Sequence, residues 1–382
     1  MLLARLQRWR QAPWLAHWPA WLAGYFLLAL LLDRLSGWQV ASAHALLAGL
    51  ALAVMRFRQK PKEIALFFLA LLLAIAWMSF RDVLHGAGWK ASERTLKAAL
   101  LVLGMLACAG LPWAQWRLSL AAALAGGMAV VVAYVGPGQV ARALLAPLEF
   151  GAAGGLATPM NRNGLALPLG LLSCWAVAAA CQLRPRWLWL LPVAVLSLLM
   201  LANGSRNAIA ALLVAVLFML SRRYPGQVGV VGLGALLAGV VSYLVQPEYW
   251  VHGTLLSYRD VIWAEVFRHL PEHLWFGAGS AYFREVVAPA LPIKVIIAHS
   301  AHLDFLLAYG LVGVLLFTLA GICLARLARA QPSPGQALWV EGSFVFLAIF
   351  GVFDRGHLDA LMLAAMLMIP ALLAALWTRL RR

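Results

Sequence analysis

The stretch "AHSAHLDFLLAYGLVG", residues 298–313, places two imidazoles and a carboxylate at the start of a long apolar run. His299 and His302 lie on one helical face if the helix already includes them. An imidazole titrates near neutral pH and is therefore suited to act as a general base. Zinc binding is the weaker interpretation, because no His-Glu-x-x-His pattern is present and Asp304 is out of phase with the histidine pair. Asp304 either orients an imidazole or caps the start of the apolar run, and we favour the cap.

Three arginines stand at the ends of apolar runs, in the segments "TPMNRNGLALP", "LANGSRNAIAAL" and "SYRDVIW". An arginine at such a place is usually an anchor that extends to the lipid headgroups. Arg206 fits that role poorly, because the turn that holds it and Ser205 is very short. A helix is expected directly after this turn, and the N–H groups at its start favour anions. Arg206, Arg259 and Arg162, the last followed by Asn163, are therefore candidates for binding a phosphate or diphosphate headgroup.

The composition indicates a membrane protein. Of the 382 residues, 64% are apolar and 12% are charged, whereas a soluble domain is about half apolar and about a quarter charged. Long apolar runs recur from end to end and leave no room for a large soluble domain. We attribute the net charge of +16 to basic cytoplasmic loops and not to binding of nucleic acid, since no compact basic domain is present. The four cysteines lie in apolar segments and are expected to be core residues.

The apolar runs predict an all-α fold, a polytopic membrane protein of about twelve transmembrane helices that forms one domain over residues 1–382. The basic start of the chain is expected to be a short interfacial helix and not a cleaved signal peptide. The predicted spans are 19–33, 38–54, 64–80, 96–111, 118–135, 164–181, 187–202, 207–220, 228–245, 303–325, 338–353 and 360–378.

The charge distribution predicts that both termini lie in the cytoplasm. With the N-terminus inside, the short inner segments hold 17 of the 30 Lys and Arg residues but only two of the 14 acidic residues. An excess of basic residues marks the cytoplasmic side of a membrane protein. The outer side then receives three long loops, at 81–95, 136–163 and 246–302, and loops of this length usually carry function.

The last of these loops, residues 246–302 between the ninth and tenth spans, is expected to fold into a small helical cap on the outer face. The segment "SYRDVIWAEVFRHLPEH" has apolar residues at helical spacing. Ser257 is expected to cap this helix and Pro271 to end it. The segment "FGAGSAYF" that follows predicts a glycine-rich turn.

These motifs together resemble the signature of the bacterial O-antigen ligase and O-antigen polymerase superfamily. In that pattern a His-Ser pair, here His299 and Ser300, is followed after nine residues by Gly-x-x-Gly, here Gly310 to Gly313. The segments "NRNGLA", "GSRNA" and "YRDVIW…WFGAGSAYF" occur in the expected order, each where the superfamily has an arginine-bearing outer loop. The number of spans, the cytoplasmic ends and the single large outer loop before the histidine also match.

The resemblance implies a glycosyltransferase of the C-type class in the bacterial inner membrane, with its active site on the periplasmic face. Members take a glycan from undecaprenyl diphosphate, and the ligases transfer it to the lipid A-core oligosaccharide, without a metal or other cofactor and with inversion. The family histidine corresponds to His299, and its two key arginines correspond to Arg206 and Arg259. Arg162 is expected to help bind the diphosphate. Supporting roles are assigned to Ser205, Asn163, His302 and Asp304.

Three other activities remain open at this point. A polymerase of the same superfamily uses a second lipid-linked repeat unit as acceptor, and the modest length favours the ligase. A protein O-oligosaccharyltransferase tends to have an additional C-terminal part, which the sequence does not show. An anion transporter, from a different class, usually places charge near the middle of the membrane, whereas the predicted spans here are almost free of charge.

Overall fold

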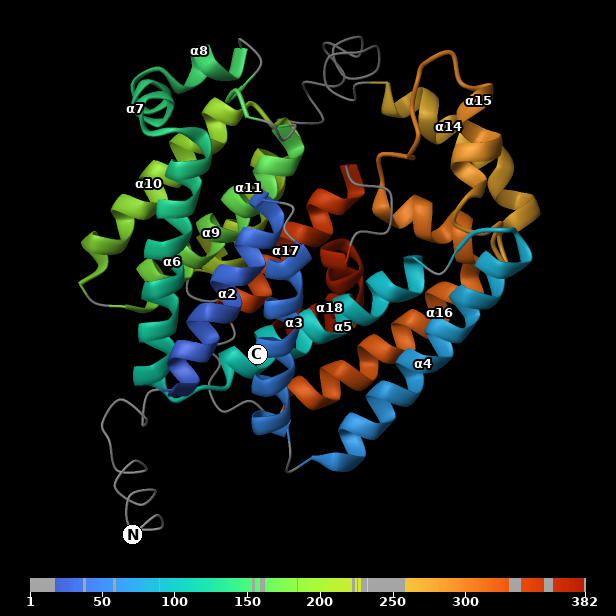
Figure 1. Cartoon of the computed structure of the whole chain (residues 1–382), viewed down its shortest axis with the longest axis horizontal. Coiled ribbons are helices and arrows are strands. Elements are labelled where there is room, and N and C mark those ends of the chain that lie inside the picture. The colour runs from blue at the N-terminus through green and yellow to red at the C-terminus, as the bar shows by residue number, and fades with distance from the viewer. Residues whose placement is uncertain are drawn as a thin grey trace. The chain divides into compact units, whose positions relative to one another are not determined.

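The computed structural model (Figure 1) describes residues 18–36, 39–57, 60–88, 90–152, 155–158, 162–183, 185–221, 224, 226–227, 232, 258–329, 338–353 and 360–380. In these ranges every regular element is a helix, as the sequence predicts. Eleven of the twelve predicted spans coincide with helices, and the ninth, 228–245, lies almost wholly outside the described ranges. The matching helices are α2 (Trp18–Ser36), α3 (Gln39–Phe57), α4 (Pro61–Leu84), α5 (Lys90–Ala109), α6 (Trp113–Val135), α9 (Arg162–Gln182), α10 (Arg186–Asn203), α11 (Arg206–Leu220), α16 (Ala301–Arg329), α17 (Leu338–Phe353) and α18 (Ala360–Leu380).

The chain is a polytopic membrane protein. Within the described ranges, four helices are long and apolar enough to cross a membrane, and several other apolar helices are shorter. The four are Pro61–Leu84, Ala114–Val135, Arg162–Gln182 and Ala301–Leu327. The full count of twelve spans stays a prediction.

The structure corrects two details of the outer loops. Residues 136–163 contain two short helices, α7 (Pro137–Leu145) and α8 (Pro147–Ala152), where a long loop was expected. The helix expected to end at Pro271 continues to His273 as α14 (Arg259–His273). Proline lacks an N–H but keeps its carbonyl, so a turn of helix can follow it when tertiary contacts hold the chain. Two further short elements, η2 (Phe283–Val287) and α15 (Ala288–Ala290), follow the glycine-rich turn.

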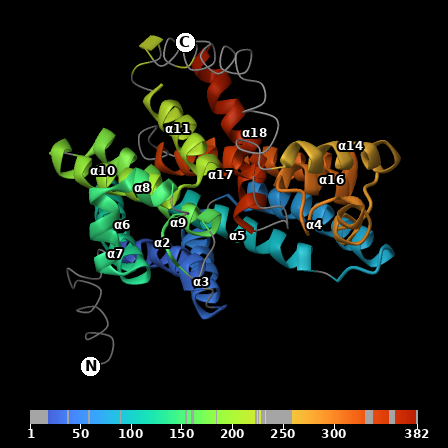
Figure 2. The same cartoon turned by 90° about the horizontal axis from the view of Figure 1, so that it is seen from above.

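By backbone contacts the chain divides into two compact units, and the first comprises Met1–Pro61, Leu100–Leu212 and Ala330–Ser343. Its central helix is α9, in which every residue from Gly164 to Ala179 is buried. A helix that is apolar on all sides is expected to be buried, with other helices packed around it. In this unit α9 contacts α10, α6 and α2, and it lies beside α10 in both views (Figure 1, Figure 2).

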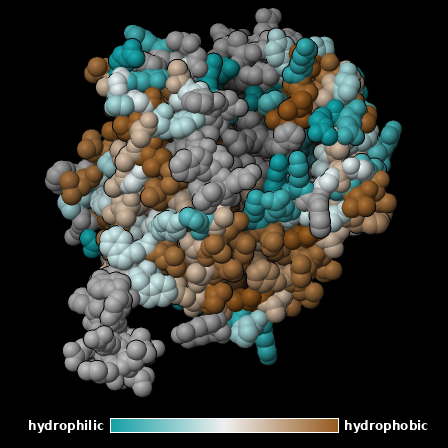
Figure 3. Space-filling view, in the orientation of Figure 1, coloured by the Kyte–Doolittle hydropathy of each residue, from teal (hydrophilic) through white to brown (hydrophobic). Residues whose placement is uncertain are grey.

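The second unit comprises Lys62–Ala99, Leu213–Arg329 and Phe344–Arg382. Here α16 packs along α18, and α14 lies over the first turns of α16 (Figure 2). The outer surfaces of α4 and α16 carry exposed large apolar side chains, and Figure 3 shows a continuous hydrophobic area over these helices. Such an area on a protein with membrane spans is expected to face lipid. Its members include Leu66, Leu69, Leu72, Phe80, Leu315 and Leu319.

Helix α16 is broken at Gly310, which has φ 63° and ψ −171°. Only glycine adopts this backbone conformation without strain. A Cβ at this position would also lie 2.4 Å from the carbonyl oxygen of Trp275. The glycine is therefore required both by its backbone angles and by the close approach of another chain segment.

The segment 274–279 lies against this break and satisfies the backbone groups that the break releases. Inside a membrane such groups need partners within the protein, because lipid offers none. The Trp77 Nε1–H also donates to the carbonyl of Tyr309 at 3.0 Å. The backbone hydrogen bonds run from the N–H of Ala278 to Leu307 O (2.8 Å), Gly279 to Ala308 O (2.8 Å), Leu311 to Leu274 O (2.8 Å) and Val312 to Trp275 O (3.1 Å).

Candidate active site

In the first unit, Arg162 and Arg206 are the first residues of α9 and α11. Two hydrogen bonds join the starts of these helices. The Ser205 hydroxyl donates to Asn163 Oδ1 at 2.8 Å, and the Asn203 amide donates to the Arg162 carbonyl at 2.7 Å. The four residues predicted for this half of the site therefore lie together, and both arginine side chains are exposed.

The turn before Arg206 is held in place by glycines. Gly204 follows α10 in the left-handed conformation, with φ 68° and ψ 16°. A Cβ on Gly204 would lie 2.9 Å from the carbonyl oxygen of Gly151, and one on Gly155 would lie 2.4 Å from the carbonyl of Asn203. The chain leaving α8 thus packs directly on the turn. The position of Arg206 is consequently fixed by backbone contacts, as the short turn in the sequence predicts.

In the second unit, His299 stands just before α16, between two residues whose polar groups are fixed. The Ala298 carbonyl accepts a hydrogen bond from Trp263 Nε1 at 3.0 Å, and its N–H donates to Asp304 Oδ1 at 3.2 Å. Ser300 Oγ accepts a weak hydrogen bond from the N–H of Leu303 at 3.4 Å, at the first turn of the helix. His299 itself has φ 52°, an uncommon backbone conformation for a non-glycine residue.

This geometry bears on the roles expected for the two neighbouring polar residues. Asp304 accepts a hydrogen bond from the N–H of Ala298, just before the helix, and its role as a cap stays a prediction. The expected shared face of His299 and His302 is not present, because α16 begins at Ala301, after His299. His302 instead places Nε2 3.1 Å from the carbonyl oxygen of Ala348 in α17. It ties α16 to α17, and a direct role in chemistry stays a prediction.

Arg259 is the first residue of α14 and is only 6% exposed. Its Nε–H donates to the carbonyl oxygen of Phe353, the last residue of α17, at 2.6 Å. One turn later, the Trp263 ring lies 6.1 Å from the Phe353 ring, measured between centroids. Since Trp263 also bonds the Ala298 carbonyl, one indole links the surroundings of Arg259 to those of His299. The expected cap residue, Ser257, lies outside the described ranges.

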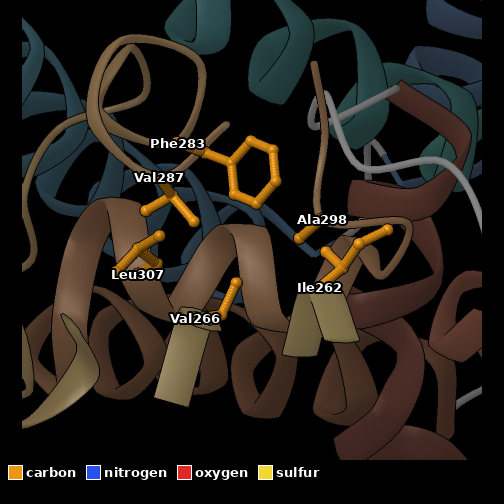
Figure 4. Packing of buried hydrophobic residues seen from close by; sticks show 6 residues of the cluster. All are labelled: Ile262, Val266, Phe283, Val287, Ala298 and Leu307. Atoms are coloured by element: carbon orange, nitrogen blue, oxygen red, sulfur yellow. The ribbon is translucent and has the colours of Figure 1, made fainter. Parts of the chain in front are cut away.

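A small apolar core holds these parts of the second unit together (Figure 4). Side chains from α14, from the segment 283–287, from the chain before α16 and from α16 itself converge there. Burial of such side chains stabilises a fold by about 1.5–3 kcal/mol each. This core fixes the cap helix on α16, and its buried members are Ile262, Val266, Phe283, Val287, Ala298 and Leu307.

A second polar cluster, at the end of α4, is absent from the sequence-based prediction. Asp82 is fully buried and accepts hydrogen bonds from the Ser280 N–H at 2.9 Å and the Tyr309 hydroxyl at 3.2 Å. Arg81 donates to the carbonyl of Gly277. The signal in the sequence was the adjacent pair "RD" at the end of an apolar run. These residues bind the glycine-rich turn to the broken helix, so they position the cap.

The cap also carries histidines that are not part of the predicted site. His269 Nδ1 lies 3.0 Å from the hydroxyl of Tyr282, and the His273 ring meets the Tyr282 ring edge-on at 4.6 Å. Burial lowers the pKa of His273 and raises that of Tyr282. Both side chains are therefore uncharged at neutral pH and serve packing within the cap.

Among the residues that the structure describes, no group of three or more His, Cys, Asp and Glu side chains is arranged to hold a metal ion. The predicted site contains three arginine side chains and the imidazole of His299, each at or just before a helix start. Metal independence of the reaction stays a prediction.

The comparisons with known proteins bear on the segment that contains most of this site. Residues 191–318 match the family model described as O-antigen ligase. A 131-residue segment is 30% identical to an O-antigen ligase of Pseudomonas aeruginosa, covering 34% of this chain and 31% of that protein. About a third of the chain is therefore similar to the O-antigen ligase family. No solved structure matches the chain.

The part of the chain that matches the O-antigen ligase family contains Arg206, Arg259 and His299, while Arg162 and Asn163 precede it. The aligned segment spans about a third of the curated relative. Arg206 belongs to the first unit and the other two residues belong to the second. Their convergence on a single substrate stays a prediction.

Proposed function

We propose that this protein is an O-antigen ligase. It transfers a glycan from undecaprenyl diphosphate to the lipid A-core oligosaccharide at the periplasmic face of the bacterial inner membrane. One observation carries the proposal: within the segment that matches the family, Arg206 and Arg259 are the first residues of their helices and His299 stands two residues before another. The start of a helix presents N–H donors and a partial positive charge, which favour a diphosphate.

The reaction requires a base and a means of stabilising the leaving group. His299 takes the proton from the acceptor hydroxyl as its oxygen attacks the anomeric carbon. The bond between that carbon and the diphosphate oxygen breaks, and the diphosphate departs with the electron pair. Arg206 and Arg259, with help from Arg162, stabilise the charge on the departing group in a partly dry site. The energy of transfer comes from the lipid-linked donor itself.

The break in α16 does not favour the transporter alternative. Transporters use broken helices to direct backbone groups at a solute in the membrane. Here the backbone N–H and C=O groups near the break at Gly310 form hydrogen bonds with the segment 274–279 and with Trp77. The arginines stand at helix starts and not in the middle of a span, which fits a reaction at the membrane surface.

The test is transfer by the purified full-length protein from undecaprenyl-diphosphate glycan, in buffer that contains EDTA. The protein is given either lipid A-core or a second lipid-linked unit. We expect elongation of lipid A-core, loss of about 10²–10⁴-fold in rate for His299→Ala, and a loss of similar size for Arg206→Ala. Arg142→Ala, which alters an exposed arginine in α7, is the matched control and should retain full activity.

Several results would contradict the proposal. Elongation of the lipid-linked unit alone identifies a polymerase. Full activity of His299→Ala or Arg206→Ala removes the mechanism. Activity only after addition of Mg²⁺ or Mn²⁺ removes the metal-free route.

A further inference from the structure

The second unit contains a cavity of about 340 Å³ that the mechanism above does not use. It is built from the chain before α5 and the first turns of α5, from the glycine-rich turn and the residues after it, from the chain before α16, and from the first turns of α16. Its volume is at the lower end of the range for small-molecule sites, with room for about one or two sugar rings.

The cavity reaches the immediate neighbourhood of the proposed base. Asp304 and Ile297 line it. The Asp304 carboxylate also accepts the hydrogen bond from the N–H of Ala298, the residue before His299. A molecule held in this cavity would therefore lie beside the segment that carries His299. All the residues concerned belong to the second unit.

Basic side chains outnumber acidic ones in the lining. Lys90 and Arg94 stand four residues apart on α5, which places them on the same face of the helix. Arg284 also lines the cavity, but its guanidinium lies 3.1 Å from Glu285, and both of these side chains are exposed. With Asp304 as the second acid, the lining has three cationic and two anionic side chains. The excess of one positive charge gives the cavity a preference for an anionic group.

The rest of the lining suits a sugar. The exposed side chain of Ile296 provides apolar surface for the face of a ring, and exposed Gly86 and Gly88 leave the backbone open to hydroxyl groups. A Cβ on Gly88 would meet nothing within 4 Å, so this side of the cavity is open. Figure 3 shows hydrophilic side chains gathered where α5 begins. A purely apolar ligand would leave these polar groups without partners.

We propose that this cavity is the acceptor site, and that it binds a saccharide that carries a phosphate or carboxylate group through Lys90 and Arg94. The assignment rests on the proposed glycosyl transfer. The anionic group anchors the sugar at α5, and the sugar directs a hydroxyl along the wall formed by Ile297 and Asp304 towards His299. In this arrangement the cavity selects which acceptor is glycosylated, while the arginines at the helix starts bind the donor.

Binding is tested first, without any reaction. Purified full-length protein in detergent is titrated with glucose 6-phosphate and with galacturonate, and its midpoint of thermal unfolding is followed. We expect both ligands to raise the midpoint, and glucose or inorganic phosphate at equal concentration to have a much smaller effect. An effect of phosphate equal to that of glucose 6-phosphate would show a simple anion site and overturn the saccharide assignment, as would no effect of either sugar.

Transfer kinetics then test the role of the cavity. We expect the Lys90→Ala/Arg94→Ala variant to raise the KM for acceptor by at least about tenfold, since a hydrogen bond to a charged group is lost at each position. The KM for donor should stay within about twofold of the wild-type value, because the donor is bound elsewhere. Lys90→Glu changes an exposed side chain only and should give the same pattern if the double variant folds poorly. Lys97→Ala, a cation on the same helix that does not line the cavity, is the matched control.

The outcomes separate this inference from the proposed function. If the wild-type protein transfers glycan and the Lys90 and Arg94 variants keep the wild-type KM for acceptor, the cavity is not the acceptor site, while the ligase activity stands. If the wild-type protein transfers no glycan, this result contradicts both the proposed function and the acceptor role of the cavity. The binding titration still decides whether the cavity takes an anionic saccharide.

Discussion

At the scale of single residues, the structure shows how the side chain of Arg259 can be buried. Burial of a charge is costly unless it is hydrogen-bonded. Arg259 meets this condition through the hydrogen bond of its Nε to the carbonyl of Phe353. This bond uses one of the five N–H groups of a guanidinium and fixes the plane of the rest. Lysine, a single point charge on a flexible chain, cannot reproduce both functions.

Arg259→Lys is therefore expected to reduce the rate of glycan transfer about tenfold or more, although the charge is kept. The measurement is the rate with purified protein at saturating donor and acceptor. Arg268→Lys is the matched control, because Arg268 lies on the same helix but is exposed and pairs with Glu265. Equal rates for Arg259→Lys and the wild type would show that the geometry of the guanidinium is not needed.

At the scale of elements, the apolar runs in the sequence predict the helices well, because a backbone inside a membrane must satisfy its own hydrogen bonds and a helix does so within one segment. The break in α16 was not predicted: the run 303–325 reads as one continuous span. Gly310 was noted only as part of a motif. The reason for the break lies in the segment 274–279, whose hydrogen bonds to α16 join residues 29 to 37 positions apart. Contacts of this kind leave no local periodic signal, and the same holds for Asp82 and its partners.

The break makes a clear prediction for stability. Gly310→Ala should destabilise the protein by about 3 kcal/mol, since the backbone conformation excludes a side chain and the added Cβ would meet the Trp275 carbonyl. The measurement is the midpoint of thermal unfolding in detergent. Gly138→Ala in α7, where a Cβ would meet nothing within 4 Å, is the control and should leave the midpoint unchanged. An unchanged midpoint for Gly310→Ala would show that α16 can run straight without cost.

The sequence indicated which residues to consider for the candidate site, but not the contacts that these residues make. Unusual polar residues at the ends of apolar runs indicated Arg206, Arg259 and His299 from the sequence alone. The structure adds the contacts around them: the Ser205–Asn163 bond, the bond from the Trp263 indole to the Ala298 carbonyl, and the bond from the Ala298 N–H to Asp304. The first two contacts join residues 42 and 35 positions apart, so only their end points were visible in the sequence.

At the scale of the whole molecule, the distribution of the net charge of +16 predicts how the protein is oriented in the membrane. The basic residues concentrate in the short segments assigned to the cytoplasm, and the long segments assigned to the periplasm are nearly neutral. Basic residues resist transfer across the membrane during insertion, so this asymmetry predicts the orientation. The predicted orientation would place the start of α14, the start of α16 and the cavity near α5 on the periplasmic side, where lipid-linked glycans are expected to be used.

This orientation predicts which positions a reagent can reach in intact cells. Glu149→Cys, exposed in the segment between α6 and α9, should react with a maleimide that does not cross the inner membrane. Lys62→Cys, exposed at the start of α4, should react only after the membrane is permeabilised. The wild-type protein, whose cysteines are buried or half-buried, gives the background. The reverse pattern would place the arginines and His299 in the cytoplasm, and a lipid-linked donor on the periplasmic face could not reach them.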